Sequence, residues 1–502
     1  MLTTQGLSNV LWVVLFGNWL LEGRWSEKWQ MAKGSPLLLA LAVLLLLHLA
    51  GWLWSSNYAD AWGMTEKVLP LTAMLLVGIT TPLPQPRQRS VILGIYILTV
   101  LVVSVIGVVR WLTIPNLPYN DIIPYISHIR FSLNCCMAIF IVGIGQWTAN
   151  SGCPRLLPMS HRRLSTVLST AVILWLLSFL LLQRSYTAVA VLVVASFTAI
   201  FTLRRRWLWL AVWLVVVGTA ATFVVSGCRS YYRMQPIATA PLAATTPNGN
   251  AYEHRQDGLI ENGNYVYNYL CLDEMRTQWQ RRSAISCDNL VGGSYSLESV
   301  LIRYLNALGL PKDSAGVAAM TAAQVAEVER GVENPVYASH NPFKKMLYVM
   351  LFEYENYRCY RAVDGFTMLQ RIELWKAALR VTATHPWIGV GTGDLHDAMD
   401  EALAEMQSPI AGRRLLPHNQ YLTYLALFGI PAFIVLAVLF VRALVLRRRQ
   451  APLPTITVVW LTIILVSCLT ENTLGSLIGV LFSTWFYGLT PSPSPQGEGS
   501  RN

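Results

Sequence analysis

Long runs of apolar residues, each close to the length of a membrane-crossing helix, constrain the fold of this chain more than any other feature of its sequence. Such runs cover 36–54 and 91–109, and a helix needs about 20 apolar residues to cross the hydrocarbon layer. Because lipid satisfies no backbone hydrogen bonds, these runs predict helices. Of the 502 residues, 54% are hydrophobic and only 13% are charged, a balance that cannot cover a water-soluble surface.

The hydrophobic pattern predicts about eleven membrane-spanning helices, eight before and three after a long polar segment. The predicted spans are 7–21, 36–54, 66–81, 90–111, 132–148, 164–182, 186–203, 207–226, 419–444, 454–470 and 473–488. We therefore expect an all-α polytopic membrane protein. Its expected divisions are an N-terminal bundle of about eight helices at 1–226, a helical outer domain at 227–418, C-terminal membrane helices at 419–488 and a disordered tail at 489–502.

The distribution of Lys and Arg between the short loops predicts the orientation of these helices. One set of alternate loops holds fourteen Lys and Arg residues, whereas the opposite set holds at most four. Since cytoplasmic loops are enriched in Lys and Arg, we expect the segment 227–418 to lie on the outer side, and eleven spans would also place the N-terminus there. The same loops account for the net charge of +11, so this charge does not indicate a nucleic-acid partner.

The outer segment has the apolar periodicity of helices. Amphipathic patterns predict helices over 296–308, 313–331, 341–363 and 365–381. Ser296 and Asp313 are the expected N-caps of the first two, and the turn-rich stretch 243–265 is expected to be a loop.

Four cysteines fall in the outer segment: Cys228, Cys271, Cys287 and Cys359. In an oxidising compartment they could form two disulfides in any of three pairings, or remain free thiols. Their spacing does not resemble a zinc site, and we expect no metal.

Arg184 and Arg371 are two charged residues expected at the outer membrane surface. Arg184 lies in a very short turn between two predicted spans, where it could anchor a helix end or act functionally. Arg371 shares a predicted helix face with Trp375 and Leu379, which places a cation beside an apolar strip. Such a helix could aim Arg371 at a lipid phosphate, although an ordinary solvated charge is the simpler interpretation.

His418 lies at the predicted outer mouth of the ninth span, just after Arg413 and Arg414. A histidine there can exchange a proton near neutral pH, and neighbouring arginines can bind an anionic substrate. A capping or structural role for a single histidine is the alternative. The glycines at 389, 391 and 393 form G-x-G-x-G without a preceding predicted strand, so a turn before a helix at 394–407 is favoured over a nucleotide site.

At these residues the sequence resembles the bacterial O-antigen ligase family, particularly its Bacteroidota members. The resemblance rests on RIELWKAALRVTATHPWIGVGTGD, PHNQYLTYLALFGIPAF and SCLTENTLGSLIGVLFSTWFYGL, and is strongest over 290–488. It implies a GT-C-like helix bundle in the bacterial inner membrane with a cavity open to lipid and periplasm.

The resemblance also implies an activity and its residues. Family members move a glycan from an undecaprenyl-pyrophosphate carrier to an acceptor hydroxyl, on the lipid A core in ligases, without a cofactor. Arg184 and Arg371 would match arginines that engage the pyrophosphate, and His418 would match the histidine of an HN motif completed by Asn419. Arg413, Arg414 and Trp375 are further candidates for substrate binding. The sequence departs from the family in its count of eleven spans, where twelve are common, and in lacking a second acidic residue near Gly475.

Other functions remain open at this point. A polysaccharide polymerase would use the same chemistry on a carrier-linked acceptor. A transporter or flippase of lipid-linked glycan would place ionisable residues at mid-membrane, whereas here they gather near one surface. A sensor would need a cytoplasmic output module, and no segment of the sequence suggests one.

Overall fold

The computed structural model describes residues 5–489 except for several short stretches. These stretches are 83, 115–116, 119–120, 125, 151–161, 184, 204, 233–241, 292–294, 340, 364–366 and 451–453. The predicted disordered tail at 489–502 lies outside the described residues except for Leu489.

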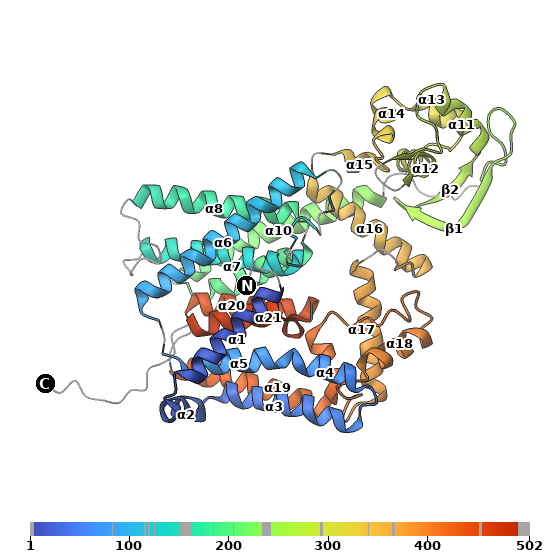
Figure 1. Ribbon diagram of the computed structural model, residues 1–502. Helices are drawn as coiled ribbons and strands as arrows, with labels where there is room; N and C mark the ends of the chain where they lie inside the picture. Colours follow the sequence, from blue (N-terminus) through green and yellow to red (C-terminus); the bar gives the residue numbers. More distant parts are fainter. Residues whose placement is uncertain are drawn as a thin grey trace. The chain divides into compact units, whose positions relative to one another are not determined.

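The described chain is predominantly helical (Figure 1). The first half contains α1 (Gln5–Leu21), α2 (Trp25–Lys33), α3 (Pro36–Ala50), η1 (Gly51–Trp54), α4 (Tyr58–Glu66), α5 (Val68–Thr80), α6 (Pro86–Thr113), α7 (His128–Asn150), α8 (Arg162–Leu182), α9 (Tyr186–Ile200) and α10 (Arg206–Tyr232). The middle contains β1 (Glu253–Glu261), β2 (Asn264–Leu270), α11 (Leu272–Gln280), β3 (Leu290–Val291), β4 (Tyr295–Ser296), α12 (Leu297–Leu308), α13 (Ser314–Ala319), α14 (Ala322–Glu329), α15 (Pro335–Ala338) and α16 (Pro342–Tyr360). The last part contains α17 (Thr367–Thr384), α18 (Leu395–Glu405), α19 (Gln420–Gln450), α20 (Thr455–Thr470), η2 (Thr473–Gly475) and α21 (Leu477–Leu489).

Every predicted span coincides with a helix over most of its length, which confirms a predominantly helical polytopic membrane protein. Among the described residues, six helical segments are long and apolar enough to cross a membrane, and four further apolar helices are shorter. The six are Pro36–Trp54, Tyr58–Thr80, Arg87–Thr113, His128–Gly145, Arg206–Tyr232 and Gln420–Leu446.

The chain forms two compact units, and they divide it differently from the sequence-based boundaries at 227 and 418. Unit 1 contains Met1–Ala211 and Arg371–Asn502, and unit 2 contains Val212–Gln370. Most of α17, all of α18 and the turn between them therefore pack with the membrane helices. This segment packs with the membrane helices because it forms hydrogen bonds to α3 and α19, described below. The amphipathic pattern of the sequence does not show these contacts.

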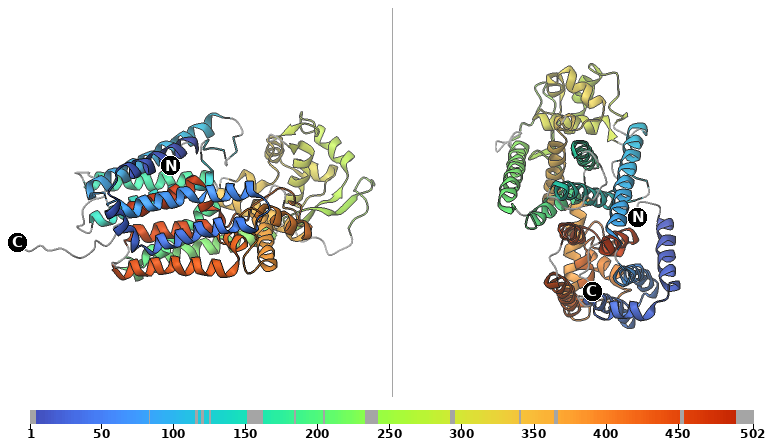
Figure 2. Two further views of the ribbon diagram at one scale, coloured as in Figure 1. Left: turned by 60° about the horizontal axis from the view of Figure 1, so that its bottom comes forward. Right: turned by 90° about the vertical axis from the view of Figure 1, so that its left-hand side faces the viewer.

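The core of unit 1 is built around α7, α9 and α20, which lie side by side in Figures 1 and 2. Threonine hydroxyl pairs fix the register of α9 against α20: Thr187 with Thr470 (3.4 Å), Thr198 with Thr462 (3.0 Å) and Thr202 with Thr455 (2.7 Å). Rising numbers in α9 meet falling numbers in α20, so the two helices are antiparallel.

α19 is broken at Gly429, which has φ 76° and ψ 175° and precedes Pro431. The break frees backbone groups that a continuous helix would pair, and the turn after α17 satisfies them. Val390 N–H donates to the carbonyl of Ala426 (3.0 Å), and Ile430 N–H donates to that of Pro386 (2.8 Å). The sequence predicted one uninterrupted span at 419–444, but a proline there removes a helical donor and favours a break.

The G-x-G-x-G segment is the turn that the sequence predicted, and it also contacts the end of α3. Thr392 Oγ1 donates to the carbonyl of His48 (2.7 Å), and Gly393 N–H donates to Ser55 Oγ (2.9 Å). The Asp394 carboxylate accepts from the backbone N–H of Ser56 (2.9 Å). Through these hydrogen bonds, the turn connects the end of α3 to the segment that leads to His418.

Replacing Gly429 with alanine should destabilise the whole of unit 1. Its positive φ is unfavourable for an L-residue by roughly 1–2 kcal/mol, and the added Cβ would lie 2.6 Å from the backbone carbon and oxygen of Trp387. Gly412→Ala is the matched control, because Gly412 also has positive φ (78°) but open space around it. Thermal unfolding in detergent should show a clearly larger drop in melting temperature for Gly429→Ala, and equal drops would refute the packing explanation.

Unit 2 contains a β-hairpin that begins within 243–265, a stretch that the sequence predicted to be a loop. β1 and β2 pair antiparallel around Asn262 and Gly263, whose φ values are 57° and 77°. An Asn-Gly pair with both φ positive is the favoured two-residue hairpin turn. The expectation was wrong because turn-forming residues were interpreted as a loop without considering that they could connect two strands.

The helices of unit 2 mostly follow the predicted pattern. Ser296 caps α12 by accepting from Ser299 N–H (3.3 Å), and Asp313 caps α13 by accepting from Gly316 N–H (2.7 Å), as predicted. The helix expected over 313–331 is two shorter helices, because Thr321 starts α14 with its own capping box. The thiols of Cys228, Cys271, Cys287 and Cys359 are free.

Candidate active site

His418 occupies an unusual backbone position immediately before α19. Its φ is 48°, which is rare for a residue with a side chain and persists only where the surroundings enforce it. Asn419 supplies part of this enforcement, because its side chain accepts from the N–H groups of Tyr421 (3.0 Å) and Leu422 (3.1 Å) and so caps the helix. The His418 side chain is 44% exposed, which leaves it accessible.

Contacts between α19 and the turn after α20 bring Glu471 to His418. Thr423 Oγ1 donates to Asn472 Oδ1 (2.8 Å), and Leu474 N–H donates to Gln420 Oε1 (2.9 Å). Glu471 Oε2 consequently lies 3.7 Å from His418 Nδ1, a distance for an ion pair but too long for a hydrogen bond.

Arg371 of α17 completes a three-residue cluster. Its Nη2 forms an ion pair and hydrogen bond with Glu471 Oε1. Both side chains are largely buried, at 16% and 15% exposure, so water screens their charges only weakly. Arg371 and His418, separated by almost fifty residues of chain, are thus joined through one carboxylate.

Two further residues at the beginning of α7, His128 and Arg130, lie close enough for electrostatic interaction with Glu471. His128 also interacts electrostatically with Arg371. Glu471 therefore interacts with two guanidinium groups and two imidazoles, and His128 also interacts with the carboxylate of Asp121. Glu471 by itself cannot neutralise both guanidiniums.

Glu471 remains ionised despite its burial. Removal from water opposes the charged form, but nearby His418 and the charges of Arg371 and Arg130 outweigh that effect and hold the pKa of the Glu471 carboxyl below its ordinary value. The negative charge is therefore present throughout the neutral range.

Arg184 lies outside the described residues, but its neighbours in the chain are placed. Gln183 is fully buried and accepts through Oε1 from Ser132 Oγ of α7 (2.8 Å). Thr187 contacts Thr470, the residue before Glu471. Both contacts occur at the ends of α7 and α20 that carry the charged cluster.

Arg414 lies apart from this cluster in a carboxylate-rich environment. Its guanidinium pairs with Asp60 (2.5 Å) and Asp397, and its backbone N–H donates to Asp400 (3.1 Å). These contacts fix the loop that precedes His418. Arg413 is exposed.

Trp375 lies one helical turn after Arg371 on α17, as the sequence predicted. Its indole Nε1 is buried and has no acceptor within the described part of the chain. A buried donor of this kind normally has a partner, so Trp375 is a candidate to donate to a bound molecule. Among the described residues, no group of three His, Cys, Asp or Glu side chains could hold a metal ion.

The fold defines a multi-pass membrane protein with a cluster of charged side chains near the ends of several helices. Residues 314–437 match the family model described as O-Antigen ligase, a region that includes Arg371, Trp375, His418 and Asn419. This region is therefore an O-antigen ligase domain, and the match supports a membrane enzyme of the ligase or polymerase kind. No curated protein matches the chain.

Sequence reasoning missed part of this cluster. Glu471, Arg130 and His128 were not among the candidate site residues that the sequence suggested. An ionisable residue directly at the end of the apolar run 454–470 was the available signal for Glu471, because charges at such positions are costly and often functional.

Glu471→Gln should lower glycan transfer by about tenfold or more, equivalent to roughly 1.4 kcal/mol of barrier, because Arg371 and His418 lose their shared partner.

Because the pKa of Glu471 is depressed, the contribution of its charge is present above the ordinary carboxyl pKa of about 4.3. It is lost only as the pH falls through the lower value. Wild-type transfer should therefore show no loss from Glu471 protonation between pH 5 and 8. Glu405→Gln, which removes an exposed partner of Arg380, is the control; equal activity of the two variants would exclude a role for Glu471.

Proposed function

We propose that this enzyme transfers a glycan from undecaprenyl pyrophosphate to an acceptor hydroxyl at the periplasmic surface of the bacterial inner membrane, acting as an O-antigen ligase on lipid A core. The observation that carries the proposal is the group of basic side chains near Glu471, which combines Arg371, Arg130 and two histidines. The location of His418 and Arg371 within the family match supports the same assignment.

Pyrophosphate fits this cluster because it carries several negative charges close together. Arginine forks can bind two of its oxygens at once, and they bind more strongly as charge develops on the leaving group. Glu471 alone leaves one guanidinium charge uncompensated, whereas a pyrophosphate could compensate both. We include Arg184 in the site, since the residues flanking it contact the same ends of α7 and α20.

The reaction would be a direct displacement at the anomeric carbon of the donor sugar. The acceptor oxygen forms a bond to the anomeric carbon while the bond between that carbon and the phosphate oxygen breaks. The configuration at the carbon is inverted. Undecaprenyl pyrophosphate leaves with the bonding electrons, and the guanidiniums of Arg371 and Arg130 stabilise its charge. No nucleotide sugar or metal is assigned to the step.

His418 would accept the proton of the attacking hydroxyl. Its side chain is accessible, and Glu471 lies near enough to stabilise the imidazolium that forms. Asn419 acts through the backbone by fixing His418, and Arg414 holds the preceding loop. Trp375 would donate its indole N–H to substrate, and exposed Arg413 would contact the anionic acceptor.

Surface polysaccharide from a deletion strain tests the proposed acceptor. Carrier-linked polymer beside bare core on a gel is expected for a ligase. Core bearing a single repeat would instead identify a polymerase, and bare core with carrier-linked glycan retained on the cytoplasmic side would identify a transporter.

A further inference from the structure

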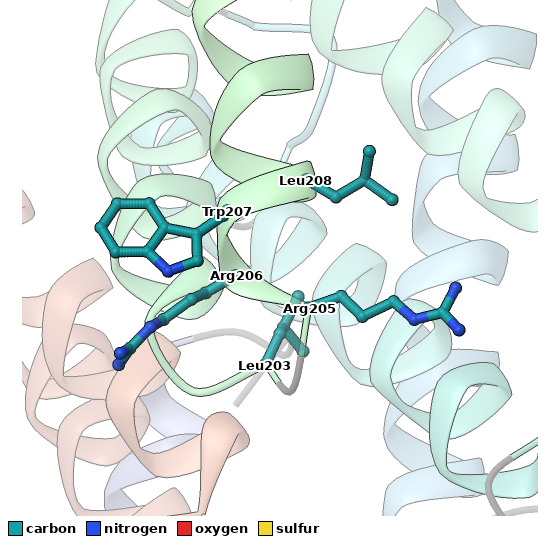
Figure 3. A pocket seen from close by; sticks show the side chains of 5 residues that line it. All are labelled: Leu203, Arg205, Arg206, Trp207 and Leu208. Carbon is teal, nitrogen blue, oxygen red and sulfur yellow. The ribbon is translucent and has the colours of Figure 1, made fainter.

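A basic pocket lies where α9 ends and α10 begins (Figure 3). Leu203, Arg205, Arg206, Trp207 and Leu208 line it. Figure 3 shows Arg206 and Trp207 on one side of the helix end and Arg205 with Leu208 on the other. The Arg206 guanidinium lies 5.5 Å from the Trp207 ring, in the range of a cation–π contact.

The two arginines differ from Arg371, Arg380 and Arg414, each of which pairs with a carboxylate. Within the described part of the chain, neither Arg205 nor Arg206 forms an ion pair. Their charges are therefore available to an anion that is not part of the protein.

The pocket lies at the opposite membrane surface from the Glu471 cluster. Thr202, near the end of α9, contacts Thr455 at the start of α20, whereas Glu471 follows the other end of α20. The 16 residues of α20 separate these ends by about 24 Å, close to the thickness of the hydrocarbon layer. The pocket is thus outside the proposed active site.

The apolar residues of the pocket indicate that its ligand is a lipid. Trp207 is 71% exposed and Leu208 is 57% exposed, and both begin a helix whose apolar stretch is unburied within the protein. Tryptophan favours the headgroup level of a bilayer, and paired basic residues at that level attract anionic lipid. A free phosphate would use the arginines but would gain nothing from Trp207 and Leu208.

We propose that Leu203, Arg205, Arg206, Trp207 and Leu208 bind the headgroup of an anionic phospholipid at the cytoplasmic surface. One guanidinium on each side of the helix end contacts the phosphate, and Trp207 and Leu208 contact the glycerol and upper acyl chain. This site is independent of the proposed glycan transfer. If these arginines served only to orient the helices, the protein would not select among lipids. The proposed pocket should instead bind anionic phospholipid in preference to neutral lipid.

Native mass spectrometry of the full chain, released from mixed micelles of phosphatidylglycerol and phosphatidylcholine, tests the proposal. Wild-type protein should retain phosphatidylglycerol preferentially, and the double variant Arg205→Gln/Arg206→Gln should lose about tenfold in that preference, equivalent to about 1.4 kcal/mol. Trp207→Ala should weaken retention while leaving the charge unchanged.

The control Arg281→Gln/Arg330→Gln removes the same charge from unit 2. An equal loss in this control, or unchanged selectivity in the Arg205/Arg206 variant, would overturn the proposal. Displacement of the lipid by inorganic phosphate, with Trp207→Ala behaving as wild type, would also overturn it in favour of simple anion binding. Thermal unfolding of each variant separates a lost site from a lost fold.

Discussion

Arg371→Ala is expected to lower glycan transfer by about 100- to 1000-fold, because it removes the guanidinium that pairs with Glu471 and would hold the leaving pyrophosphate. Arg371→Lys should recover only a small part of the activity, since an ammonium keeps the charge but lacks the planar fork. Transfer would be measured in membranes, with radiolabelled carrier-linked glycan and purified core acceptor.

Arg380→Ala is the matched control for this prediction. Arg380 lies on the same helix and pairs with Glu405 (2.8 Å), but both side chains are about half exposed. Such surface ion pairs contribute little to stability, so this variant should transfer glycan nearly as well as wild type. Full transfer by Arg371→Ala, with normal insertion, would remove Arg371 from the site.

His418→Ala is expected to reduce turnover by about 100- to 10,000-fold, the range typical of a lost general base. Because His418 would act on the acceptor hydroxyl, the affinity for the donor should change little, in contrast to Arg371→Ala. The comparison requires kcat and KM for the donor to be measured separately.

His385→Ala serves as the control, since His385 is an exposed histidine of unit 1 that contacts Thr384 (3.0 Å). A His418→Ala variant with a wild-type kcat would exclude proton transfer by this residue. A variant that instead lost donor affinity with normal kcat would assign His418 to binding.

The membrane helices could be predicted from the sequence because lipid leaves the backbone no alternative to internal hydrogen bonding. Each apolar run became a helix for this reason. The break in α19 at Gly429 was missed, because it depends on donors and acceptors supplied by Pro386 and Val390. Pro386 and Val390 lie before α19 in the chain, in a separate turn. The sequence does not show that their backbone groups stabilise the break.

The candidate site was predictable only in part. Arg371 and His418 stood out as polar residues beside apolar segments, and the structure brings both to Glu471. Glu471, and Arg130 on α7, reach the site through contacts between helices that are remote in sequence. Their proposed roles could therefore not be predicted from the sequence alone. The hairpin of unit 2 was missed for a local reason, since the Asn262-Gly263 turn was available in the sequence.

Binding of undecaprenyl pyrophosphate to the purified full chain tests most directly whether the cluster around Glu471 is an anion site. The measurement compares wild type with Arg371→Ala, Arg130→Ala and the control Arg380→Ala in the same detergent. Loss of either guanidinium from the cluster should weaken binding about tenfold or more, whereas the control should bind as wild type does. Equal affinity in all four proteins would contradict the assignment of Arg371 and Arg130 to the pyrophosphate.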